Sequence, residues 1–272
     1  MSSKEIETPE YDSNPFTLSF KGFGLLVDYA KGVFIAILIF SFFGFIVNMA
    51  SYIPSNNNTN SSSISGSSTA SADPINWGMV AGIATLVIGI SVVAIAFSVL
   101  ISAAYKGFVA AGAVAAVERR KITAGEAFSE MGSRFGVLFS AELNTTLRII
   151  GGMLLFIVPG IRAQLRYLST PYIIMQNKDI SASNAVKSSK DLYRNHLMEA
   201  FGISTVGGLI PFIGSAVAAS GMAMSVQQLT AYDKLGKATP KTHILNYIGF
   251  IFIAFIFVFA FMFGLLLALS TN

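Results

Sequence analysis

Long apolar runs without a charged side chain occupy much of this chain. Residues 32–71, 76–105 and 244–272 contain no Asp, Glu, Lys or Arg. A helix of the length of the second run would rise roughly 45 Å, more than the ~30 Å of hydrocarbon in a bilayer. Because lipid offers the backbone no hydrogen-bonding partners, these runs predict transmembrane α-helices. They do not alternate apolar and polar residues, which argues against a transmembrane β-barrel.

The pattern predicts an all-α fold: a polytopic integral membrane helical bundle with two Pro/Gly-broken helical hairpins and interfacial amphipathic helices. A polar N-terminus with an amphipathic helix is expected over residues 1–30, and a single transmembrane domain over residues 31–272. The expected spans cover residues 32–53, 77–105, 136–158, 161–177, 198–210, 212–230 and 244–267.

Two segments with proline and glycine near their middle predict the hairpins. The first has a glycine pair from Gly151, an apolar stretch and a break at Pro159-Gly160. The second has a glycine pair from Gly207 and a break at Pro211. The shared order indicates a weak internal repeat, although proline and glycine are also common at the breaks of unrelated helices.

Three segments carry apolar residues on one helical face and are expected at the cytoplasmic surface of the membrane. The first follows Asn14-Pro15 and has Phe16, Phe20, Phe23 and Val27 at helical spacing. The second lies in a loop expected over residues 106–134, where a capping-box pattern of Thr123 and Glu126 accompanies Ala124, Ala127, Phe128, Met131 and Phe135. The third covers residues 181–197, with Ala182, Ala185, Val186, Leu192 and Tyr193 on one side and Lys187, Lys190 and Arg194 on the other.

Composition and one polar segment agree with a membrane protein. The chain is 53% hydrophobic and 12% charged, with a mean hydropathy of +0.65, whereas soluble domains carry about 25% charged residues. Residues 54–75 are mostly Ser, Asn and Thr and contain no Lys or Arg. This segment is therefore expected to be a disordered, extracytoplasmic linker.

The distribution of the 18 basic residues predicts the orientation in the cell membrane. Fifteen of them lie before the first span, in the expected 106–134 loop, between the hairpins or before the last span. The positive-inside rule places these segments and the N-terminus in the cytoplasm. Each hairpin returns to the side that it left, so three single crossings leave the C-terminus extracytoplasmic. Topology accounts for the net charge of +4, and no nucleic-acid partner is expected.

Three basic residues remain, all in the first hairpin together with Glu142: Arg148, Arg162 and Arg166. Ionisable side chains inside a membrane are costly and indicate a functional site. Arg162 and Arg166 are four residues apart and share one helix face, where an anionic lipid head group is a natural ligand. The alternative is that these arginines snorkel to the surface or pair with Glu142.

Short motifs in and after the first hairpin resemble a broad family of prokaryotic membrane proteins. They are Ile-Val-Pro-Gly-Ile at 157–161, Arg-Tyr at 166–167, Pro-Tyr-Ile-Ile at 171–174 and Ser-Asn-Ala-Val-Lys-Ser-Ser at 183–189. The family includes the membrane domain of some glycerophosphoryl diester phosphodiesterases, and the resemblance covers residues 100–235. It implies a multi-pass helical bundle without catalytic residues in the membrane part. No phosphodiesterase domain is present here, so that activity is not carried over.

The polar residues do not form a catalytic or metal-binding pattern. The only histidines, His196 and His243, lack metal-ligand spacing, and there is no cysteine. Ser204 has no histidine within a span to activate it as a nucleophile. Enzyme activity, a metal and a cofactor are therefore not expected.

Two functions of different class remain. The first is a non-enzymatic membrane component that scaffolds, anchors or organises lipids or membrane protein partners. The alternative is a transporter or the membrane subunit of a transport system, because broken helices in repeated hairpins can build substrate sites. Few polar residues occur within the expected spans, which favours the first: Asn48, Glu142, Asn144 and Arg148.

Overall fold

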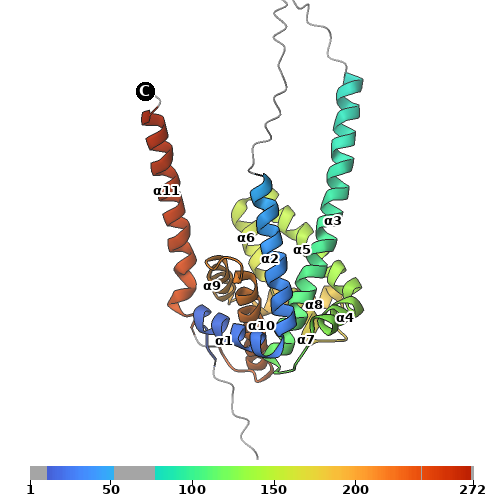
Figure 1. Cartoon of the computed structure of the whole chain (residues 1–272), viewed down its shortest axis with the longest axis vertical. Coiled ribbons are helices and arrows are strands. Elements are labelled where there is room, and N and C mark those ends of the chain that lie inside the picture. The colour runs from blue at the N-terminus through green and yellow to red at the C-terminus, as the bar shows by residue number, and fades with distance from the viewer. Residues whose placement is uncertain (1–10, 52–76, 240, 271–272) are drawn as a thin grey trace, which may run out of the picture.

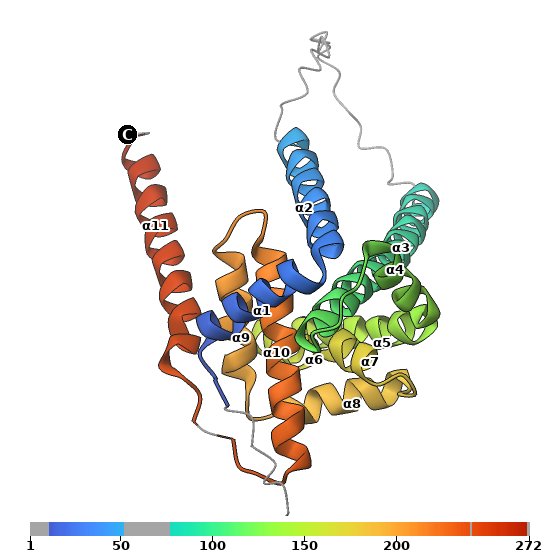
Figure 2. The ribbon, with the colours of Figure 1, turned by 60° about the horizontal axis from the view of Figure 1, so that its bottom comes forward.

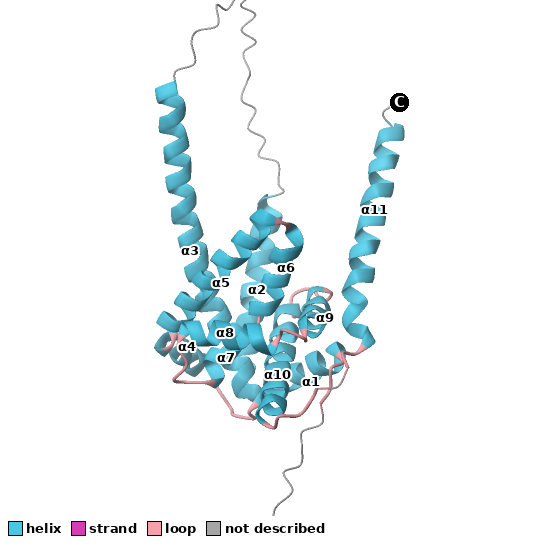
Figure 3. Cartoon of the chain, turned by 180° about the vertical axis from the view of Figure 1, so that it is seen from behind, coloured by secondary structure: helices cyan, strands magenta, loops and turns pink. Residues whose placement is uncertain are grey.

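The computed structural model describes residues 11–51, 77–239 and 241–270. These residues form helices and loops with no strand among them, which confirms the all-α prediction (Figure 3). The helices are α1 (Pro15–Tyr29), α2 (Lys31–Ser51), α3 (Trp77–Val117), α4 (Ala124–Ser133), α5 (Phe135–Leu155), α6 (Ile157–Tyr167), α7 (Thr170–Gln176), α8 (Ala182–Leu192), α9 (Leu197–Gly208), α10 (Gly214–Lys234), the 3-10 helix η1 (Ile244–Tyr247) and α11 (Ile248–Ser270). The linker expected over residues 54–75 lies outside the described residues.

Two helical segments are long and apolar enough to cross a membrane, and both coincide with predicted spans. They are Ala81–Val117 in α3 and Ile244–Leu267, which runs from η1 into α11. A third is obtained if α1 and α2 are taken as one span with a 112° bend between them. The prediction of helices suited to a membrane is thus confirmed at these places.

A compact body of helices forms the base, and three long helices rise from it on one side (Figure 1). They are α2, the N-terminal part of α3, and α11, which stands apart from the other two (Figures 1, 2 and 3). The described side chains of residues 81–98 in α3 and 250–269 in α11 are all exposed. Apolar side chains in such positions require a surrounding of lipid or of another protein.

Helix α3 is longer than the predicted span, which corrects the expectation of a loop over residues 106–134. It has 41 residues, and its last part, residues 107–117, is buried in the body. The small residues of this part allow close packing, since a Cβ on Gly112 would lie 2.5 Å from Cγ1 of Val33 in α2. The connecting loop is reduced to residues 118–123.

The turn of the first hairpin lies earlier than predicted. Helix α5 ends at Leu155, Phe156 is extended, and α6 begins at Ile157. Pro159 therefore sits in the first turn of α6, where its missing amide would have had no helical partner. The five apolar residues of the tip, 154–158, are 72–83% exposed. The second hairpin turns at residues 209–213, around Pro211 as predicted.

The short arms of both hairpins do not have the length of a crossing helix. Helices α6 and α9 have 11 and 12 residues, which correspond to roughly 16 and 18 Å against a hydrocarbon core of ~30 Å. The segment expected as one span over residues 161–177 is divided, because α7 starts anew at Thr170-Pro171 and is buried in the body. The tip of the first hairpin points in the same direction as α2 (Figure 1).

The three amphipathic helices form, with one difference in α1. That helix buries Leu18, Ser19, Gly22 and Leu26 against the body, while the predicted apolar face with Phe20 stays partly or fully exposed. The capping box of α4 is present, with Ala127 and Met131 buried and Phe128 exposed. In α8 the predicted apolar side is buried at Ala185, Val186 and Tyr193, and Lys187, Lys190 and Arg194 are exposed.

Candidate functional site

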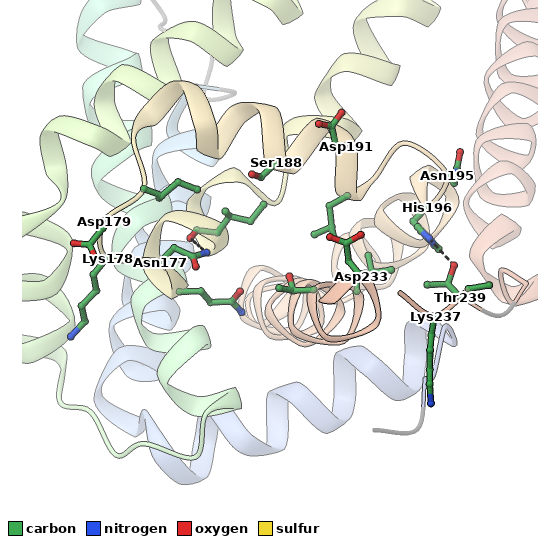
Figure 4. A pocket seen from close by; sticks show the side chains of 17 residues that line it. Asn177, Lys178, Asp179, Ser188, Asp191, Asn195, His196, Asp233, Lys237 and Thr239 are labelled. Carbon is green, nitrogen blue, oxygen red and sulfur yellow. Dashed lines mark hydrogen bonds between the residues drawn. The ribbon is translucent and has the colours of Figure 1, made fainter. Parts of the chain in front are cut away.

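A cavity of about 960 Å³ lies in the base of the molecule (Figure 4). Its walls are the loop between α7 and α8, helix α8, the C-terminal part of α10 and the segment after it. Ile173, Leu192 and Leu229 give it apolar wall. The volume lies within the range of about 300–1,000 Å³ typical of small-molecule sites.

Charged side chains surround this cavity without pairing. Asp233 from α10 lies near its middle, Asp191 lies on α8 at one edge, and Lys178 with Asp179 and Lys237 lie toward its two ends (Figure 4). Among the described residues these five side chains make no ion pair or hydrogen bond. The cavity is therefore lined by charged groups that are open to water or to a polar ligand, and it is not an apolar slot for a lipid chain.

A buried polar network lies directly beside the cavity. Glu199, the third residue of α9, is 1% exposed. Its Oε2 accepts a 2.7 Å hydrogen bond from the Tyr11 hydroxyl, and its Oε1 lies 2.9 Å from Nδ1 of His196. The other ring nitrogen of His196, Nε2, is 3.0 Å from Oγ1 of Thr239, which lines the cavity. The pKa of Tyr11 is raised above its ordinary value, first by burial and second by the nearby Glu199 carboxylate.

The N-terminal segment is also bound to the start of the last span. The Ser13 hydroxyl accepts a 3.0 Å hydrogen bond from the backbone N–H of His243, and the Ser13 carbonyl accepts one of 2.7 Å from Nδ2 of Asn246. Asn246 is fully buried and packs on α9, where a Cβ at Gly202 would collide with it. The segment before α1 and the segment before α11 are thereby joined at the base.

Glu142 and Arg148, two of the four predicted site residues, do not pair with each other. Glu142 accepts hydrogen bonds from Ser102 Oγ at 2.8 Å and from Lys106 Nζ at 2.5 Å, both on α3. Arg148 donates to Oδ1 of Asn144 at 2.7 Å, and its guanidinium also contacts Tyr167. These contacts join α5 to α3 and to the end of α6, so they have a structural explanation.

Arg162 and Arg166, the other two predicted site residues, have different surroundings. Arg162 is exposed and has no ion pair or hydrogen bond among the described residues. Arg166, one turn further along α6, lines a second pocket of about 340 Å³ together with Lys190, Asp191 and Arg194. Sequence reasoning placed Lys190 and Arg194 only on a polar helix face. Their spacing of four residues was the available signal that they act together.

No metal centre is built by the part of the chain that the structure describes, since no three His, Asp or Glu side chains gather there. Among the described residues His196 lies within ion-pair distance of one carboxylate, that of Glu199. The expectation that the protein uses no metal or cofactor stays a prediction.

Comparison with protein-family models, with curated proteins and with solved structures found no match. The resemblance of residues 100–235 to the membrane domain of some glycerophosphoryl diester phosphodiesterases therefore stays a prediction from the motifs alone.

Proposed function

We propose that this chain is a non-enzymatic, multi-pass protein of the cell membrane that organises lipids or partner proteins. The supporting observation is the exposure of the long apolar surfaces of α3 and α11 on one side of a polar, basic base. Lipid chains would cover these apolar surfaces. The basic side chains of the base would bind anionic lipid head groups or a partner protein.

The proposed orientation follows from the basic residues. Most of those described belong to the base, including Lys121, Lys187 and Lys237, and the positive-inside rule puts this face in the cytoplasm. Helices α2, α3 and α11 are then the three single crossings. In this orientation the N-terminus is cytoplasmic, whereas the 54–75 linker and the C-terminus are extracytoplasmic.

The surface elements favour a platform that lies in the cytoplasmic leaflet. Helix α1 is bent by 112° from α2 and presents Phe20, which is 49% exposed, away from the body. The hairpin tip at residues 154–158 presents further exposed apolar side chains. In a bilayer, a helix lying in the interface and a hairpin that enters from one side both displace lipids of one leaflet.

The second candidate, a transporter or transport subunit, draws support from the two antiparallel helix pairs. Helices α5 and α6, like α9 and α10, are consecutive helices that pack against each other, and α6 packs against α9. Paired broken helices can hold a substrate near the midplane. The cavity with unpaired charges, however, lies at the base, so we rank this function second.

Reconstitution of the full chain in vesicles tests the proposal. Spin-labelled phosphatidylglycerol and phosphatidylcholine report how many lipids the protein immobilises. We expect a larger immobilised fraction for the anionic lipid, and no protein-dependent flux of a panel of ions, sugars and amino acids. Equal fractions for the two lipids together with saturable flux of one solute would overturn the proposal and favour the transporter.

A further inference from the structure

We infer that the pocket between α6 and α8 binds the phosphate of an anionic phospholipid through Arg166, Lys190 and Arg194. This inference rests on the proposed function and gives it a site. Two guanidinium groups and one ammonium group surround a space of about 340 Å³, and Asp191 is the one carboxylate that lines it. The pocket therefore carries an excess of positive charge.

The positive charges of this pocket are not neutralised by ion pairs among the described residues. Among the described residues none of the three basic side chains is within ion-pair distance of a carboxylate, including that of Asp191. Nε of Arg166 is buried and has no hydrogen-bond partner. A buried donor without a partner is costly, and an anion in the pocket would supply the missing acceptor. A guanidinium fork fits two phosphate oxygens at once.

Helix α6 carries Arg166 and helix α8 carries Lys190, and these two helices are fixed to each other, while Arg194 follows two residues after the end of α8. The Ser189 hydroxyl donates a 2.7 Å hydrogen bond to the carbonyl oxygen of Arg166, and it lies 2.7 Å from Oγ of Ser169. Ser189 is fully buried, so these bonds form away from water. Because the link joins the backbone of α6 to the last turn of α8, Arg166 and Lys190 are held beside one space before a ligand arrives.

The place of the pocket along α6 favours a lipid over a soluble phosphate. Helix α6 begins at the exposed apolar tip, and Arg166 lies nine positions after Ile157, a rise of roughly 14 Å, close to half of the ~30 Å hydrocarbon core. With the tip near the midplane, Arg166 reaches the level of the lipid phosphates. Ile161, 45% exposed, leaves apolar surface along α6 for an acyl chain. Exposed Arg162 offers a second contact.

Cations near the C-terminal ends of α6 and α8 also have an explanation without a ligand. Arg166 and Lys190 are in the last turns of their helices, where positive charge is favourable for the helix dipole. The helix-dipole effect acts on each positive charge independently, so it does not explain why the three basic residues line the same pocket. The two explanations predict different ligand binding, so the experiment separates them.

The test uses the full chain in micelles of neutral detergent doped with phosphatidylglycerol or phosphatidylcholine, with bound lipid measured by native mass spectrometry. The variant Arg166→Gln/Lys190→Gln/Arg194→Gln removes the pocket charges. The matched control, Lys21→Gln/Lys121→Gln/Lys187→Gln, removes the same charge from exposed positions outside the pocket. Circular dichroism of both variants shows whether they keep the helical fold.

We expect the pocket variant to bind phosphatidylglycerol about tenfold more weakly, the loss of one strong charged contact or more. The control variant and the binding of phosphatidylcholine should change little. Arg166→Lys, which keeps the charge without the fork, should weaken binding less than Arg166→Gln. This milder pair of variants decides the matter if the triple variant does not fold.

Equal losses in the pocket and control variants would overturn the inference, because they would show attraction to overall charge. A wild-type preference for phosphatidylglycerol that survives in the pocket variant would refute the site and leave the proposed function intact. Absence of any preference in the wild type would instead remove the lipid arm of the proposed function. A competition experiment with glycerol phosphate shows whether the site prefers a lipid or a soluble phosphate. If glycerol phosphate displaces the lipid at equal concentration, the site is not a lipid site.

Discussion

The hydroxyl of Tyr11 donates a 2.7 Å hydrogen bond to the buried carboxylate of Glu199, although the two residues are 188 positions apart in the chain. This bond attaches the segment before α1 to the start of α9. His196 and Thr239 extend the network to the segment that leads to α11. A side-chain network of this kind joins the segment before α1, the start of α9 and the segment before α11 within the base.

Replacement of Tyr11 by Phe should destabilise the protein by about 1.5–3 kcal/mol, the usual loss for a hydrogen bond to a charged group. Burial and Glu199 raise the pKa of Tyr11, so the neutral phenol is favoured in the folded state. The stabilisation is then complete below the ordinary pKa of about 10, declines as the pH rises above that value and is fully lost only at the raised folded-state pKa. Thermal unfolding in detergent, followed by circular dichroism from pH 7 to 11, measures both effects.

The control for this measurement is Tyr29→Phe, because the Tyr29 hydroxyl has no hydrogen bond among the described residues. It should keep the wild-type loss of stability at alkaline pH, whereas Tyr11→Phe should show less of it. Identical pH profiles for the two variants would argue against a role of the Tyr11–Glu199 bond in stability.

Two glycines of α1 should respond in opposite ways to a methyl group. A Cβ on Gly22 would lie 2.7 Å from the carbonyl oxygen of Ser220, so Gly22→Ala should separate α1 from α10 and lower the melting temperature. Gly24 has open space around it, and Gly24→Ala should be neutral or stabilise the helix by up to about 1 kcal/mol. A stabilising Gly22→Ala would show that α1 does not pack on α10 in this way.

The capping box of α4 should contribute to stability in a pH-dependent manner. Thr123→Ala removes the side-chain acceptor for the Glu126 amide and should cost about 1 kcal/mol. Hydrogen bonds from the backbone and side chain of Thr123 lower the pKa of Glu126. This contribution is therefore present above the ordinary glutamate pKa of about 4.3 and is lost as the pH falls through the folded-state value.

Hydrogen exchange of the α4 amides at pH 7 and pH 3 measures the effect of the capping box. Wild-type α4 should lose protection at pH 3 relative to Glu126→Gln, whose side chain does not titrate. If both proteins lose the same protection, the ionised Glu126 does not stabilise the helix.

Local patterns predicted the elements whose identity depends on neighbouring residues in the chain. The closing apolar segment Ile244–Leu267, the capping box of Thr123 and Glu126 and the apolar face of α8 all belong to this class. Their signals are length without charge, residue spacing at a helix start and the helical period. These signals act within one or two turns and survive in any tertiary arrangement.

Contacts between distant segments could not be predicted in this way. Residues 107–117 were expected in a loop, yet they continue α3 into the body, where their small side chains allow close packing. Arg166 was expected to share an anion site with Arg162 on one helix face, but tertiary packing puts it with Lys190 and Arg194. The pocket depends on how α6 meets α8, which no spacing within either helix specifies.

The central claim, that the basic base faces the cytoplasm and long apolar helices cross the membrane, is tested most directly by cysteine labelling. The chain has no cysteine of its own, so single cysteines can be introduced as Ser62→Cys in the linker and Lys187→Cys in the base. Intact cells that express each variant are treated with a membrane-impermeant maleimide. Ser62→Cys should react without permeabilisation, and Lys187→Cys only after it. Reaction of Lys187→Cys in intact cells, or equal protection of both positions, would contradict this account.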